Sequence, residues 1–92
     1  MDRDRAAAIS LKVLAFIAED AKRLQRFLNL TGIEPAALAA LAPKTHFQAA
    51  VLEYLQSDEV LLLEFCAREA LDPTLPARAS RVLKGGKDQP LS

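Results

Sequence analysis

The sequence contains little of the chemistry that catalysis or metal binding usually requires. Among its 92 residues there is one cysteine, Cys66, one histidine, His46, and no tryptophan. One cysteine can form no internal disulfide, and one histidine is too few for a zinc site, which needs three or four ligands. The chain also has no glycine-rich phosphate loop, no Ser–His–Asp set and no cysteine pair. These absences predict a protein that is not an enzyme and that binds no cofactor and no metal.

Long apolar runs are missing as well. The longest strongly apolar run, Val60 to Leu63, is far shorter than the roughly 20 residues that a membrane-spanning helix needs. Residues 1–5 alternate in charge and do not lead into the apolar core of a signal peptide. Because a lone cysteine also fits a reducing compartment, we expect a cytoplasmic protein without a membrane partner.

Neither sign of charge is in excess, since twelve basic residues balance twelve acidic ones. Residues 1–33 carry six basic and four acidic side chains (net +2), residues 34–72 carry two and seven (net −5), and residues 73–92 carry four and one (net +3). Nucleic-acid-binding domains usually have a basic stripe and a high pI, so the pI of about 6.6 argues against nucleic acid as a partner. A regulator that uses the basic ends remains an alternative; the residues concerned are Arg3, Arg5, Arg78, Arg81, Lys84 and Lys87.

Apolar residues recur at the three-and-four spacing of helices, and no segment alternates with the period of a strand. The pattern predicts an all-α fold, a compact bundle of five helices with a weak sixth. The expected ranges are 4–18, 21–30, 35–41, 46–56, 59–70 and, for the weak sixth helix, 76–83. We expect one helical domain over residues 1–84 and a disordered C-terminal tail over residues 85–92, with the sixth helix burying Val82 and Leu83 at most.

Several residues match the known preferences of helix ends. Asp and Thr favour N-caps, glycine favours the left-handed position after a helix, and proline favours the first turn. The expected N-caps are Asp20, Asp58 and Thr45, the last in a capping box with Gln48; the expected stop is Gly32, and Pro35 opens the short third helix.

The sequence also lies over itself at an offset of 38 residues. Matching positions share apolar character, an aspartate cap or an acid–proline pair; examples are Val13 with Val51, Phe16 with Tyr54, Asp20 with Asp58, Phe27 with Phe65, and Glu34-Pro35 with Asp72-Pro73. This pattern predicts two similar helical hairpins joined by the short helix over 35–41. The four hairpin helices would form the walls of a closed bundle, and Asp20 and Asp58 would cap equivalent turns.

The helix expected over 59–70 has more apolar residues than one buried stripe needs. Val60, Leu61, Leu62 and Leu63 point in four successive directions, about 300° of the helix circumference. Such a helix is either the central one or carries an apolar patch for a partner. The candidate partner surface is therefore Val60, Leu61 and Leu63. The first hairpin has Lys22, Arg23 and Gln25 at the equivalent positions, so its second helix should face water.

The remaining reactive residues are expected to be structural. Cys66 follows Phe65 on an apolar helix face, which predicts a buried thiol, since reactive cysteines need an electropositive and partly exposed setting. His46 follows a helix start on the polar side and is expected at the surface. If a small-ligand site exists, the loop at residues 31–34 and its counterpart at residues 69–72 are where two duplicated halves would meet.

The chain resembles a family of short bacterial proteins of unknown function that is common in alphaproteobacteria. The resemblance covers about residues 8–75, and its most specific part is the segment Arg26-Phe27-Leu28-Asn29-Leu30-Thr31-Gly32-Ile33. It implies an all-helical bacterial cytoplasmic protein and carries over no site residue.

These features favour a non-enzymatic module that binds another protein, or a second copy of itself, through the apolar face of the helix over 59–70. Two alternatives stay open. One is a nucleic-acid-associated regulator, and the other is a small-ligand-binding protein or an enzyme without a recognisable motif.

Overall fold

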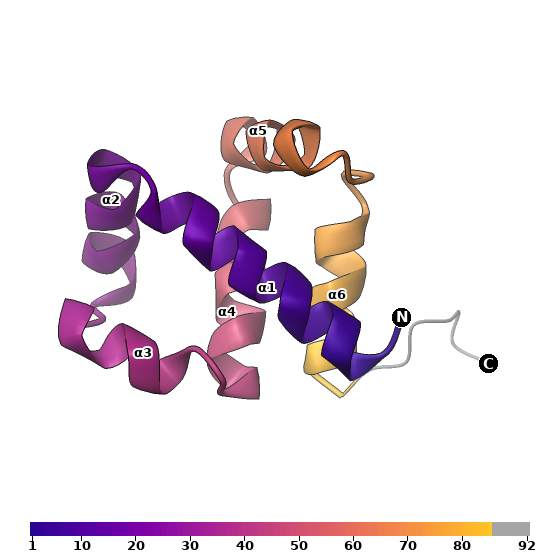
Figure 1. Ribbon diagram of the computed structural model, residues 1–92, viewed down its shortest axis with the longest axis horizontal. Helices are drawn as coiled ribbons and strands as arrows, with labels where there is room; N and C mark the ends of the chain where they lie inside the picture. The colour runs from indigo at the N-terminus through magenta and orange to yellow at the C-terminus, as the bar shows by residue number, and fades with distance from the viewer. Residues whose placement is uncertain (86–92) are drawn as a thin grey trace.

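A computed structural model describes residues 1–85, which fold into α-helices with no strand (Figure 1). The elements are α1 (Arg3–Ala18), α2 (Ala21–Thr31), a 3-10 turn η1 (Pro35–Ala37), α3 (Leu38–Leu41), α4 (Thr45–Gln56), α5 (Glu59–Glu69) and α6 (Leu75–Leu83). The predicted all-α fold is confirmed, and each predicted helix is present to within two residues at either end. The predicted tail over 85–92 lies, apart from Gly85, outside the described residues.

The helix ends show why these boundaries could be predicted. The Asp20 carboxylate accepts hydrogen bonds from the backbone N–H groups of Lys22 (2.8 Å) and Arg23 (3.2 Å), and Asp58 accepts one from Leu61 N–H (3.2 Å). Each aspartate thereby satisfies backbone donors that have no partner within their own helix. Gly32 ends α2 in the left-handed conformation, at φ 72°. The predicted caps at these three residues are confirmed.

The capping box predicted at the start of α4 is wrong. Thr45 is already helical, Lys44 occupies the N-cap position, and no side chain caps the helix. Gln48 is buried, and its Nε2 donates a hydrogen bond to the carbonyl oxygen of Ala42 at 3.0 Å. The glutamine side chain therefore binds a backbone carbonyl of the turn that precedes α4 and does not reach back to an N-cap.

The core is built on α1, α4 and α6, and not on the four hairpin helices as expected. α1 packs against both α4 and α6, and α4 packs along α6 (Figure 1). The expectation that α6 is weak is wrong, because it buries Pro76, Ala79, Ser80, Val82 and Leu83. Most of these side chains are small. They add little to an apolar pattern, yet they let helix axes approach closely.

α5 lies at the periphery, so of the two positions considered for this helix the central one is wrong. It buries only Leu61, Phe65 and Cys66. One side of α5 rests on α1, where the ring of Phe65 meets that of Phe16 edge-on at 5.6 Å between centroids. Arg68 of α5 pairs with Glu19, the C-cap residue of α1, at 2.5 Å between charged atoms, and Glu69 pairs with Lys12 of α1 at 3.7 Å. These contacts turn the opposite edge of α5 toward solvent.

The two hairpins share more than their aspartate caps. Gly32 and Ala70, one 38-residue offset apart, both adopt the left-handed conformation, and their N–H groups bond to Leu28 and Cys66, which are again equivalent positions. The aromatic contacts follow the same relation. At the offset of 38 residues Phe16 corresponds to Tyr54 and Phe27 to Phe65, so the Phe16–Phe65 contact has its equivalent in the edge-on Phe27–Tyr54 contact, at 5.0 Å between centroids. These observations support a two-fold relation between the hairpins. Their superposition stays a prediction.

We expect Ala70→Gly to stabilise the protein by roughly 0.5–1 kcal/mol. Ala70 has φ 55°, a conformation in which a Cβ is strained by about 1–2 kcal/mol and glycine is not, and the relief exceeds the greater flexibility that glycine gives the unfolded chain. Urea denaturation followed by circular dichroism would measure the change. Ala67→Gly, an exposed site inside α5, is the matched control and should destabilise by about 1 kcal/mol. Equal destabilisation by both changes would contradict the strain at residue 70.

Candidate functional site

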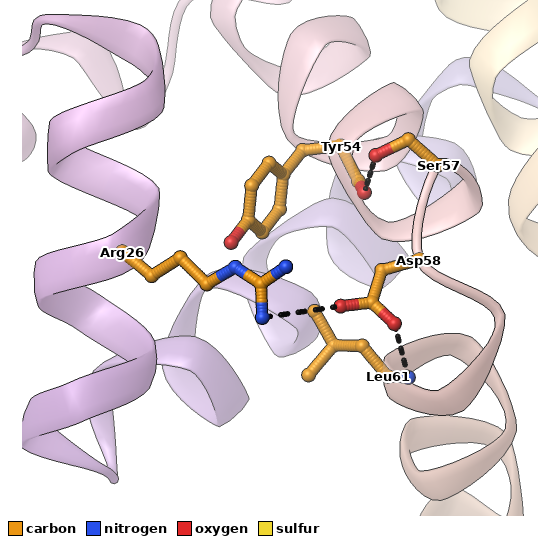
Figure 2. Close-up of polar contacts among 5 residues, drawn as sticks. All are labelled: Arg26, Tyr54, Ser57, Asp58 and Leu61. Atoms are coloured by element: carbon orange, nitrogen blue, oxygen red, sulfur yellow. Dashed lines mark hydrogen bonds and ion pairs between the residues drawn. The ribbon is translucent and has the colours of Figure 1, made fainter.

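A solvent-open cleft of about 650 Å³ lies between α2 and the corner where α4 meets α5. Figure 2 shows its two sides, with Arg26 on α2 facing the segment from Tyr54 to Leu61. We call it the α2–α5 groove. Its lining residues are Arg23, Arg26, Leu30, Tyr54, Ser57, Asp58, Glu59, Val60, Leu61 and Glu64.

The α2 side of the groove is basic. The guanidinium of Arg23 lies 4.0 Å from the ring centroid of Phe16, and its Nη1 donates a hydrogen bond to the Phe16 carbonyl oxygen at 2.6 Å. Arg23 therefore fastens α2 to α1 and fixes the position of this wall. Arg26 lies one turn further along, and its largely exposed side chain reaches across the groove toward α5 (Figure 2).

The α5 side is acidic and is formed by Asp58, Glu59 and Glu64. The Asp58 carboxylate uses Oδ1 to cap α5 at the Leu61 N–H, while its Oδ2 lies 3.9 Å from Nη1 of Arg26 (Figure 2). An ion pair of this length with an exposed arginine contributes little to stability. The two walls therefore carry opposite charges but are only weakly held together.

Apolar groups form the floor and the rim of the groove. Leu61 and the half-buried Tyr54 lie on the floor, whereas Leu30 of α2 and Val60 of α5 are 68% and 67% exposed. Burial raises the pKa of the Tyr54 hydroxyl above its usual value, and Asp58 adds to the increase while Arg26 opposes it. The hydroxyl is therefore protonated at neutral pH and can donate as well as accept a hydrogen bond.

The three residues of the predicted partner surface occupy different positions. Val60 lies on the groove rim, and Leu63, 48% exposed, lies on the same edge of α5 outside the groove lining. Leu61 is only 7% exposed and belongs to the core and the groove floor. The expectation of a water-facing second helix in the first hairpin fits Lys22 and Gln25, which are exposed, while Arg23 is half-buried against Phe16.

Sequence reasoning missed the contribution of α2 to the site. Leu30 was not singled out, although it lies off the stripe formed by Leu24, Phe27 and Leu28, and an apolar residue off the stripe is a signal of exposure. Arg26 gave no such signal, because an arginine on the polar side of a helix is ordinary. Its position opposite Asp58 depends on how the two hairpins pack.

The residues with potential catalytic chemistry lie elsewhere. Cys66 is buried, its Sγ lies 4.0 Å from the Asp72 carbonyl oxygen, and burial raises the pKa of its thiol, which disfavours the reactive thiolate. His46 is exposed and lines a second cleft of about 570 Å³ at the far end of α4, together with Arg3 and Lys84. Within residues 1–85, no three Cys, His, Asp or Glu side chains are grouped in a way that could hold a metal ion.

The other predicted ligand positions are helix ends. The segments at residues 31–34 and 69–72 contain the left-handed stops of α2 and α5, and neither contributes to the lining of the two clefts described above. Among residues 1–85, no helix has the length and the apolar character that crossing a membrane requires.

The family model for a protein of unknown function, DUF3572, matches residues 3–86, and the chain belongs to this family. The resemblance inferred from the sequence is thereby confirmed, and it covers nearly all of the described residues. No curated protein and no solved structure matches the chain.

Proposed function

We propose that this protein is a non-enzymatic interaction module that binds another protein molecule in the α2–α5 groove. The observation that carries the proposal is the position of the exposed apolar side chains. Three of the four large apolar residues that are exposed among residues 1–85 lie in or beside this groove, namely Leu30, Val60 and Leu63. Apolar groups gathered in this way are typical of protein-binding surfaces.

The size of the apolar contribution indicates what the partner must supply. Complete burial of a valine or leucine side chain is worth about 1.5–3 kcal/mol, so completing the burial of these three partly exposed side chains contributes roughly 1–2 kcal/mol each. Association costs about 4–15 kcal/mol in lost freedom and ordering. The apolar residues alone therefore do not suffice, and the charged walls must also find complementary groups on the partner.

An amphipathic helix meets these requirements. A helix places an apolar stripe between two polar edges, and this is how helices bind in hydrophobic grooves. The edge that faces Arg23 and Arg26 would be acidic, so that it complements the basic α2 wall. A small ligand fits less well, because Asp58 already caps α5 and Arg23 already binds Phe16.

Photo-crosslinking in the native host tests the proposal. We expect a benzoylphenylalanine residue at position 60 to form a discrete covalent adduct with a protein partner, since Val60 lies on the groove rim. The same residue at position 11 is the control, because Leu11 is also exposed but lies on α1 outside the groove. No adduct from position 60, or equal adducts from both positions, would contradict the proposal.

A nucleic-acid-associated role is a second candidate, favoured by one observation. Arg3 and Lys84, from the two basic ends of the chain, line the same cleft, and Arg3 Nη2 donates a hydrogen bond to the Leu83 carbonyl oxygen at 3.4 Å. Glu53 forms an ion pair with Lys84 in that cleft and reduces its positive charge. A DNA-binding titration at low and high salt would decide this, because phosphate contacts give a steep salt dependence.

A further inference from the structure

The edge of α5 has the properties that the α2–α5 groove requires of its occupant. Leu63 and Glu64 follow Val60 by three and four residues, so the three side chains share one side of the helix. α5 carries two exposed large apolar side chains, whereas α1 and α2 carry one each and the other described helices carry none. Glu59 and Glu64 have no ion-pair partner among residues 1–85. α5 therefore offers an apolar stripe flanked by free acidic groups.

The opposite wall of the groove offers the complementary charge. Arg26 is largely exposed, and its one ion pair, with Asp58, is long. α2 contains no acidic residue between Ala21 and Thr31. An acidic helix edge that enters the groove can therefore approach Arg26 without meeting a like charge on α2.

We propose that the occupant of the groove is a second copy of this chain, and that each copy inserts the Val60–Glu64 edge of its α5 into the groove of the other. The inference rests on the proposed function of the groove and names its partner. A two-fold interface must be complementary to itself, because each contact between two residues occurs twice with the roles exchanged. A groove with one basic wall and one acidic wall, whose acidic wall also carries an exposed apolar edge, satisfies this condition.

The resulting arrangement has a definite order of helices. The α5 helices of the two copies lie next to each other across the two-fold axis, with Val60 and Leu63 of each copy in contact with those of the other. The α2 helices lie on the outside, so that Arg26 of each copy faces Glu64 of the partner copy. An arrangement with the two α2 helices adjacent would instead place Arg26 against Arg26 and is disfavoured by repulsion.

The charged walls determine how this dimer should respond to salt. A standard stable interface buries about 800 Å² on each partner, more than a few apolar side chains supply. The interface must therefore include the charged walls, and its exposed ion pairs weaken as salt is added. We expect a reversible dimer that dissociates on dilution and at high salt.

Sedimentation velocity of the purified full chain, over a wide concentration range at low and at high salt, tests this inference. The wild type should shift from monomer to dimer with concentration, and Arg26→Glu or Glu64→Arg should each weaken the dimer by about tenfold or more, since each places like charges opposite one another. The double variant R26E/E64R restores opposite charges and should recover most of the affinity. Circular dichroism verifies that each variant is folded.

Lys22→Glu is the matched control, because it makes the same charge change on α2 at an exposed residue that does not line the groove. It should leave dimerisation unchanged. A wild-type chain that stays monomeric at all concentrations overturns the inference, and so does a dimer that is insensitive to the groove substitutions. If the monomer is nevertheless crosslinked to a different protein from position 60 in cells, the proposed function stands while the second-copy inference falls.

Discussion

Replacing Val82 with aspartate should unfold the protein, whereas the same replacement at Val60 should leave its stability nearly unchanged. Val82 is 6% exposed in α6, which packs against both α1 and α4. An aspartate there loses the burial of the valine and places a carboxylate without a partner in the core. We expect a loss of about 4 kcal/mol or more, which approaches the whole stability of a domain at the lower end of the usual range of about 5–15 kcal/mol.

Val60 differs from Val82 in exposure and not in chemistry. It is in the first turn of α5, where it is exposed and where an acidic residue interacts favourably with the helix dipole. The expected change for Val60→Asp is within about 0.5 kcal/mol. Urea denaturation of both variants, followed by circular dichroism, measures the difference. Similar losses of stability from the two substitutions would contradict the buried position of α6 and the peripheral position of α5.

The second large effect is expected from Phe65→Ala. Phe65 is fully buried, and its ring packs edge-on against Phe16, which also carries the guanidinium of Arg23. Removing a buried phenylalanine costs about 3–5 kcal/mol through lost burial and the cavity that remains. We therefore expect a protein that is largely unfolded at physiological temperature, as judged by thermal denaturation.

Two comparisons make this prediction specific. Leu63→Ala removes an exposed side chain two residues away on the same helix and should cost less than about 0.5 kcal/mol. Phe27→Ala should cost as much as Phe65→Ala, because exchanging the hairpins converts one aromatic contact into the other. If Phe65→Ala stayed within 1 kcal/mol of the wild type, the seam between the hairpins would not be part of the stabilising core.

The local features of the fold were predictable from the sequence because each depends on neighbouring residues. Asp20 and Asp58 cap helices that begin immediately after them, and Gly32 adopts a left-handed conformation that glycine takes without strain. The failed capping box shows the limit of such reasoning. Gln48 could reach back to an N-cap or bond to another backbone group. It donates to the Ala42 carbonyl, whose position depends on the turn before α4.

The roles of α5 and α6 could not be read from the sequence because they depend on packing between distant segments. An apolar run such as Val60–Leu63 shows that a helix has apolar residues on several sides, but not which side meets the core. Ala79 and Ser80 present the opposite case. Small residues look unremarkable in a sequence, yet both are buried in α6, which packs against α1 and α4. The apolar surplus was detected correctly, but it lies at a surface.

The same limit applies to the groove. Its α5 side was partly anticipated through Val60 and Leu61, because both belong to one short run. Its α2 side comes from a segment about 30 residues away along the chain, and the approach of Arg26 to Asp58 follows from the way the two hairpins pack. One sequence carries no signal for such a pairing.

A single protein partner that binds in the α2–α5 groove should contact both of its walls. The most direct measurement is photo-crosslinking from position 30 on α2, compared with position 60 on α5, followed by identification of the captured protein by mass spectrometry. Leu30 and Val60 line opposite sides of the groove and are equally exposed. We predict adducts with the same polypeptide from both positions. Adducts from position 60 without a counterpart from position 30, or two unrelated partners, would show that the groove is not a binding site.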